Sequence, residues 1–93
     1  MDPITLQLEF ADGKQQEISI STMPVARFRR AWDVCRPTVD ELKMLDLACN
    51  QADGWSVNLT PESFGKACDA MYKVNPDFFG SVARRQAFAS AAG

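Results

Sequence analysis

The first twenty residues alternate between apolar and polar side chains, and this alternation limits the possible folds more than any other feature. The apolar positions are Ile4, Leu6, Leu8, Phe10, Ile18 and Ile20. A period of two is typical of strands that bury one face, and Asp12-Gly13 between the two runs is typical of a turn. A hairpin alone is only marginally stable in water. The rest of the chain must therefore cover its apolar face.

The turn length follows from the side chains that would face each other across the hairpin. A two-residue loop at Asp12-Gly13 would place Leu8 opposite Glu17, an apolar side chain opposite a charged one. A three-residue loop, in which Gly13 is left-handed and forms a bulge, avoids this mismatch. It pairs Leu6 with Ile18 and Ile4 with Ile20. We therefore predict an antiparallel hairpin over about residues 3–21 with one apolar side.

Four helices are predicted after the hairpin, from apolar residues spaced by three and four and from helix start and stop signals. Their expected ranges are about 24–35, 38–51, 60–74 and 76–89, with 90–93 as a frayed tail. The expected N-caps are Thr22, Thr38, Thr60 and Asn75. Trp55, Val57 and Leu59 predict a short extended connection. The sequence thus predicts an α+β fold, an N-terminal antiparallel β-hairpin packed on a bundle of about four short α-helices.

The chain is expected to form one domain with one core. Two domains would leave each half of the 93 residues too small to bury a core. The expected core residues are Leu6, Leu8, Ile18, Phe28, Trp32, Leu42, Leu45, Phe64, Cys68 and Met71. The net charge of −2 gives no overall attraction to phosphate, so nucleic acid is not the expected partner. No apolar run is long enough for a membrane span and no signal peptide is apparent, which predicts a cytoplasmic protein.

The sequence predicts no active site. It contains no histidine, the commonest general base and metal ligand. Its three cysteines are widely spaced and are expected to be reduced thiols in the core. Its five glycines form no phosphate-binding loop. We therefore expect a non-enzymatic protein without a cofactor or metal, whose function is to bind another macromolecule.

Two features are candidates for contact with a partner. Phe78 and Phe79 are adjacent near the start of the last predicted helix, and adjacent helical positions differ by about 100°. One ring is therefore expected to pack inward and the other to remain available. Arg27 and Arg30 belong to a local cluster of arginines, completed by Arg29 and Arg36. This cluster predicts either a solvated outer face of an amphipathic helix or a contact with an acidic partner or nucleic acid.

Several strings of residues resemble the small tail assembly chaperones of long-tailed bacteriophages, especially Mu-like and related transposable phages. They are ITLQLEFADG at residues 4–13, Thr22-Met23-Pro24 before Phe28-Arg29, LTPESF at residues 59–64, and NPDFF at residues 75–79. The resemblance spans nearly the whole chain. The combination of the last two strings is its most distinctive part.

This resemblance implies a function for the chain. Such chaperones bind the tape measure protein, a long helical rod, and keep it soluble while tail tube subunits polymerise around it; they are absent from the finished virion. The tape measure protein is thus the expected partner, with the tail tube subunit as a second one to consider. Many family members also exist in a longer, frameshifted form. A small phage or prophage protein that inhibits a host enzyme by binding it is an alternative, and a nucleic-acid-binding accessory factor is a third.

Overall fold

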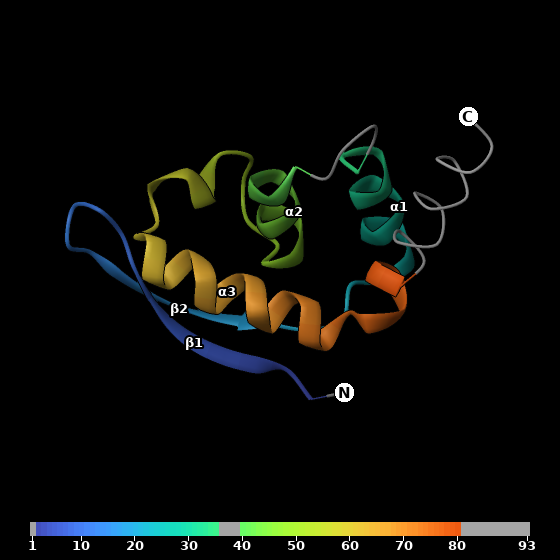
Figure 1. Ribbon diagram of the computed structural model, residues 1–93, viewed down its shortest axis with the longest axis horizontal. Helices are drawn as coiled ribbons and strands as arrows, with labels where there is room; N and C mark the ends of the chain where they lie inside the picture. Colours follow the sequence, from blue (N-terminus) through green and yellow to red (C-terminus); the bar gives the residue numbers. More distant parts are fainter. Residues whose placement is uncertain (1, 36–39, 81–93) are drawn as a thin grey trace.

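The computed structural model describes residues 2–35 and 40–80, and it confirms the predicted α+β class (Figure 1). An N-terminal hairpin is formed by β1 (Ile4–Glu9) and β2 (Gln15–Ile20). The elements that follow are α1 (Val25–Asp33), α2 (Glu41–Ala48), the 3-10 helix η1 (Trp55–Asn58) and α3 (Pro61–Val74). Residues 76–80 are helical as well. The parts of the predicted helices at 36–39 and 81–89, and the tail 90–93, lie outside the described residues.

The hairpin has the register that the sequence predicts. Leu6 pairs with Ile18 and Ile4 pairs with Ile20. The loop is closed by a bond from the Phe10 N–H to the Lys14 carbonyl (2.8 Å), and the Gly13 N–H donates to the Phe10 carbonyl (2.9 Å). Gly13 has a φ of 89°, a left-handed conformation that glycine adopts without steric cost. The three-residue loop with its glycine bulge is therefore confirmed.

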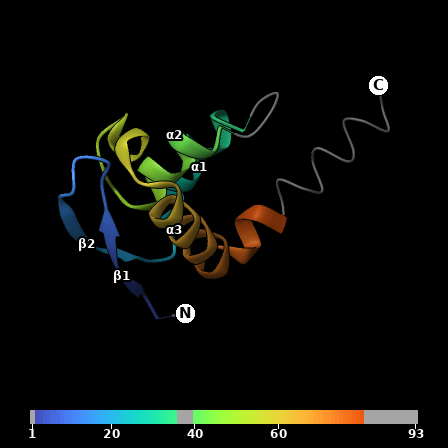
Figure 2. The ribbon, with the colours of Figure 1, turned by 60° about the vertical axis from the view of Figure 1, so that its left-hand side comes forward.

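Helix α3 covers the inner face of the hairpin and is tied to it at both ends (Figures 1 and 2). Its N-cap is Thr60, as predicted, with Oγ1 accepting from the Ser63 N–H. At this end the Thr60 N–H donates to the Glu9 carbonyl (2.9 Å). At the other end the Thr22 hydroxyl donates to the Val74 carbonyl (2.9 Å). The helix thus begins beside the end of β1 and ends just beyond the end of β2.

The predicted N-caps of the other helices are only partly right. Thr22 does not cap α1: its N-cap position is Pro24, and the Thr22 hydroxyl bonds to Val74 instead. The reason is that the backbone is still extended at Pro24 (ψ 159°), so the helix starts only at Val25, three residues after Thr22. Helix α2 begins at Glu41 with Asp40 as its N-cap, Oδ1 accepting from the Lys43 N–H (3.1 Å), whereas Thr38 lies outside the described residues.

The predicted extended connection at residues 55–59 is wrong for most of its length. Trp55–Asn58 form the 3-10 helix η1, and only Leu59 is extended, in an isolated bridge with Phe10. The cause is a buried carboxylate on α2: Asp46 accepts bonds from the Gly54 and Ser56 N–H groups, both at 2.8 Å. These two bonds curl the segment, so its alternating apolar pattern does not produce a strand.

The core lies between the hairpin, α3 and α2. Its largest fully buried side chains include Leu8, Ile20, Met44, Leu45, Met71, Val74 and Phe78. Leu6, Phe28, Trp32 and Phe64 pack at its margin and are only half-buried. The expectation for Leu42 is wrong, because this side chain is 40% exposed. It lies in the first turn of α2, beyond the part of the helix that the neighbouring elements enclose.

Candidate partner-binding surface

Phe78 is the buried member of the phenylalanine pair. Its side chain is 1% exposed. Its ring centroid lies 4.3 Å from that of Phe28 and 5.7 Å from that of Trp32, in edge-to-face arrangements that aromatic rings favour. Phe78 therefore fastens residues 76–80 to α1, and it is not available to a partner.

Phe79 is the half-buried member, and it forms a surface with a residue of α3. Its ring centroid lies 4.3 Å from that of Tyr72 and 5.0 Å from that of Phe78. Tyr72 is 40% exposed. We call these two side chains the Tyr72–Phe79 surface. It consists of apolar ring area that rests on a buried aromatic anchor, so its position is fixed by the core.

The polar group of this surface is the Tyr72 hydroxyl, which is partly shielded from water. Burial raises the pKa of Tyr72, and the nearby Glu41 carboxylate and the thiols of Cys68 and Cys35 raise it further. The phenol is therefore neutral at physiological pH. A neutral phenol next to a phenyl ring suits an apolar partner helix that also offers a hydrogen bond, because tyrosine combines a flat apolar body with a polar tip.

The cysteines are buried thiols, free of disulfides. Burial raises the pKa of Cys49 to about 12, with a further contribution from the Asp46 carboxylate. Burial also raises the pKa of Cys68 to about 12, and Glu41 adds to the effect. The pKa of Cys35 is raised by burial alone. Thiols in such surroundings stay protonated at neutral pH and are poor nucleophiles.

Arg27 and Arg30 lie together at a different place from the phenylalanines. Both line a cavity of about 220 Å³ between the start of α1 and the end of α2. Arg27 is half-buried and its Nη1 donates to the Leu47 carbonyl (3.2 Å), one of the last carbonyls of α2. Arg30 is exposed. Arg27 thus has a structural bond, whereas the charge of Arg30 remains accessible to an acidic group.

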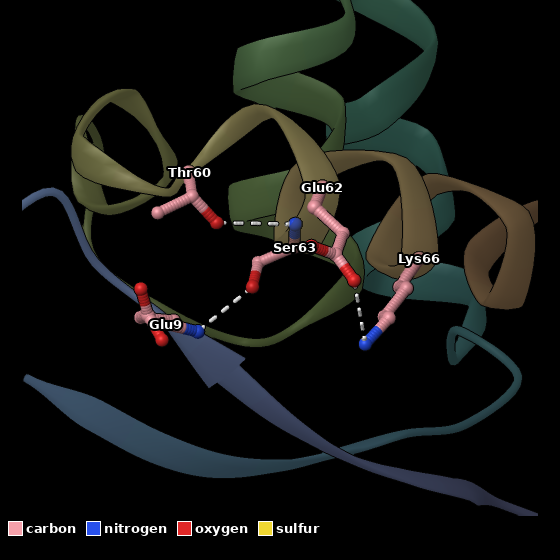
Figure 3. Close-up of polar contacts among 5 residues, drawn as sticks. All are labelled: Glu9, Thr60, Glu62, Ser63 and Lys66. Carbon is pink, nitrogen blue, oxygen red and sulfur yellow. Dashed lines mark hydrogen bonds and ion pairs between the residues drawn. The ribbon is translucent and has the colours of Figure 1, made fainter. Parts of the chain in front are cut away.

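A larger cleft, of about 440 Å³, lies where β1 meets the start of α3 (Figure 3). Its polar groups bond mainly to each other: the Glu9 N–H donates to Ser63 Oγ (2.8 Å), and Lys66 pairs with Glu62 (3.5 Å). Gln7 and Gln15, whose side chains are bonded to each other, line the same cleft. The bond between Glu9 and Ser63 holds the helix on the strand, whereas the Lys66–Glu62 pair lies within α3 and the Gln7–Gln15 bond lies within the hairpin. These polar groups are therefore explained by the fold.

Three residues that are important in the structure could not be recognised from the sequence: Tyr72 of the Tyr72–Phe79 surface, Asp46 of α2 and Ser63 of the cleft. The spacing by three and four groups Tyr72 with the apolar residues of its helix, but in the structure Tyr72 is 40% exposed and lies next to Phe79. Asp46 and Ser63 carried no recognisable signal, because a buried acid and a buried serine in a helix look like ordinary surface residues in a sequence. The Ser63 position in the first turn of α3 was the only available hint.

Comparison of the chain with models of known protein families, with curated proteins and with solved structures gives no match. Within residues 2–35 and 40–80, no cluster of three or more His, Cys, Asp or Glu side chains is arranged to hold a metal ion. In the same described ranges, no helix has the length and apolar character needed to cross a membrane.

Proposed function

We propose that this chain is a non-enzymatic tail assembly chaperone that binds the tape measure protein and keeps it soluble in the bacterial cytoplasm until the tail tube assembles. The partner comes from the resemblance of residues 4–13, 59–64 and 75–79 to such chaperones. The observation on the molecule that supports a holding function is the Tyr72–Phe79 surface. The chaperone would leave before the virion is complete.

The physical argument rests on how this surface is built. Phe78 buries its ring among Phe28 and Trp32, so the backbone that carries Phe79 is held in place by the core. A partner that binds there pays little entropy to order the rings, because they are already packed against each other. Aromatic side chains of this kind dominate the energy of protein interfaces. An amphipathic helix would place its apolar face on such a surface.

The test is co-expression with the tape measure protein encoded in the same genome. The double variant Y72S/F79S should leave less tape measure protein in the soluble fraction than the wild type does. Each aromatic anchor contributes about 2 kcal/mol or more to such a contact, so the loss should be large. Purified variants are first checked for folding by circular dichroism.

Two control variants separate binding from stability. Val57→Ser removes an apolar side chain that is 56% exposed on η1, and it should retain full activity in the assay. Phe64→Ser removes a half-buried phenylalanine of α3, about two helical turns from Tyr72. Because both phenylalanines are half-buried, Phe64→Ser should lower stability by about as much as Phe79→Ser, without changing the Tyr72–Phe79 surface. If Phe64→Ser lowers tape measure solubility as much as Y72S/F79S, the surface assignment is wrong.

The basic face of α1 is the next candidate if the aromatic variants hold the tape measure protein normally. The double variant R29A/R30A removes two exposed charges and keeps the bond from Arg27 to Leu47. Loss of tape measure solubility in R29A/R30A alone would move the site to this face. Normal solubility in every variant would refute both surface assignments, and normal solubility in the absence of the chain would refute the chaperone function itself.

A further inference from the structure

The outer edge of β1 carries backbone groups that the fold does not use. In an antiparallel pair, alternate residues direct their N–H and C=O toward the partner strand or away from it. The Phe10 N–H bonds to Lys14 of the hairpin, whereas the Glu9 N–H and C=O bond outward, to Ser63 and Thr60. Thr5 and Gln7 have the same orientation as Glu9. Within the described ranges, no group outside the hairpin bonds to their backbone.

The same edge leaves apolar side chains partly uncovered. On β1, Ile4 and Leu6 are only half-buried, whereas their partners on β2, Ile20 and Ile18, are buried. The reason is the path of α3, which begins beside Glu9 and ends beyond the end of β2 (Figures 1 and 2). The first half of β1 therefore has both unused hydrogen-bonding groups and incompletely covered apolar side chains.

The edge fits a second copy of the same chain in one register. Symmetric antiparallel pairing requires outward-facing residues to pair with each other. Pairing centred on Gln7 would place Thr5 of one copy opposite Glu9 of the other. The outward backbone groups of Glu9 are already bonded to Ser63 and Thr60. Pairing centred on Thr5 would oppose Gln7 and Pro3, which has no N–H. Pairing centred on Leu6 places Thr5 of one copy opposite Gln7 of the other. The outward N–H and C=O groups of both residues are available for this pairing.

We infer that two copies of this chain associate through their β1 edges, in antiparallel register centred on Leu6, to form a four-stranded sheet. The side chains agree with this register. Leu6 meets Leu6 of the second copy on the apolar side, and the uncharged Thr5 and Gln7 meet on the polar side. The edge of β2 is less suitable, because its apolar residues Ile18 and Ile20 are already buried and offer no uncovered apolar side chain to a second copy. The association does not depend on the tape measure protein.

Two double variants test the register by charge. T5K/Q7K places lysines opposite each other across the two-fold axis, and T5E/Q7K places an acid opposite a lysine. Within each hairpin, residue 7 faces Glu17 and residue 5 faces Ser19, so both variants should fold. In sedimentation velocity, the wild type and T5E/Q7K should sediment as dimers and T5K/Q7K as a monomer, because like charges directly opposite destabilise a strand pair.

A cross-linking experiment gives a second readout. Leu6→Cys places two thiols at a non-hydrogen-bonded pair on the axis, where the Cα atoms are close enough for a disulfide. Mild oxidation should link this variant into a covalent dimer, whereas Ser19→Cys, exposed on the opposite edge, should react far more slowly. The native cysteines are buried and should not contribute. A monomeric wild type at every concentration, a dimeric T5K/Q7K, or equal cross-linking of the two cysteine variants would overturn the inference.

Discussion

The two ends of α3 are held to the rest of the molecule in different ways. At the N-terminal end, Thr60 and the buried Ser63 bond to Glu9 beside an open cleft (Figure 3), and these contacts are partly exposed because Glu9 itself is exposed. At the C-terminal end, Asn75 is 3% exposed and its side chain bonds to Met23 and Met71. Phe78 packs against α1 just beyond it.

This difference separates the contacts that contribute most to folding stability from the surface that remains available for binding. Interactions in water-excluded sites cost more to lose than those that water can replace. The C-terminal end therefore fixes the position of α1 relative to α3, and the Tyr72–Phe79 surface lies on this well-fixed part. The N-terminal end lies near the open edge of β1. Substitutions at the two ends should have unequal effects, which the following predictions measure.

The largest effect is expected for Phe78→Ala. Removing a fully buried phenylalanine leaves a cavity among Phe28, Trp32 and Phe79 and should cost about 3–5 kcal/mol. This is a large part of the stability of a small domain. Urea unfolding should show it, whereas the half-buried Phe79→Ala should cost about 1 kcal/mol. Equal losses would mean that the two rings have the same role and that the pair has no exposed member.

Asn75→Ala should have the next largest effect. The variant removes the acceptor of the Met23 N–H (2.8 Å) and the donor to the Met71 carbonyl (3.0 Å), and it leaves both buried. An unsatisfied buried group costs about 1–3 kcal/mol. Thr22→Val is the comparison, because it removes one bond at the same end of α3 from a more exposed residue. If Thr22→Val lowers the free energy of unfolding more than Asn75→Ala does, the burial of Asn75 does not explain the stability of the C-terminal end of α3.

Ser63→Ala tests the N-terminal end of α3. It removes the acceptor of the Glu9 N–H (2.8 Å), which lies beside the cleft where water can replace it, so a loss of about 1 kcal/mol is expected. Lys66→Ala removes only an exposed ion pair with Glu62 and should change stability by less than about 0.5 kcal/mol. A Ser63→Ala loss as large as that of Asn75→Ala would remove the distinction between the two ends.

The smallest effect at neutral pH concerns the thiols between the two ends. Cys49 and Cys68 have pKa values raised from 9.0 to about 12, so both are neutral in the folded and unfolded states below pH 9. When the pH rises above 9.0, the pKa of these thiols in the unfolded chain, the thiols of the unfolded state lose their protons before those of the folded state do. Stability should therefore be constant up to about pH 9 and fall progressively toward about pH 12. Thermal melts across this range should show a shallower decline in Cys49→Ala, and an unchanged slope would exclude this thiol as a cause.

The hairpin and α3 could be predicted from the sequence because their signals are local. Alternation set the strand faces, the glycine bulge set the register, and Thr60-Pro61-Glu62 marked the start of α3. The segment 55–59 could not be predicted in this way. Its conformation depends on the Asp46 carboxylate, which is eight residues from Gly54 and bonds to it across a turn. No pattern within residues 55–59 themselves indicates this bond.

The candidate surface was predictable only in part. The divergence of adjacent helical residues predicted that Phe78 and Phe79 would have unequal environments, and the structure assigns the buried position to Phe78. Which of the two would be buried, and that Tyr72 would lie beside the other, depended on how residues 76–80 pack on α1 and α3. The arginines likewise shared a helix in the sequence, but only the fold gave Arg27 a bond to α2.

The sequence by itself determined the strands, the register and the main helix starts, because periodicity, turn residues and caps act between neighbours along the chain. The tertiary structure alone decided the burial of Asp46 and Asn75, the exposure of Leu42, and the uncovered edge of β1. Each of these depends on where one element ends relative to another. That relation is set by the packing of α3 across the hairpin and of α1 on Phe78, which brings together residues far apart in the sequence.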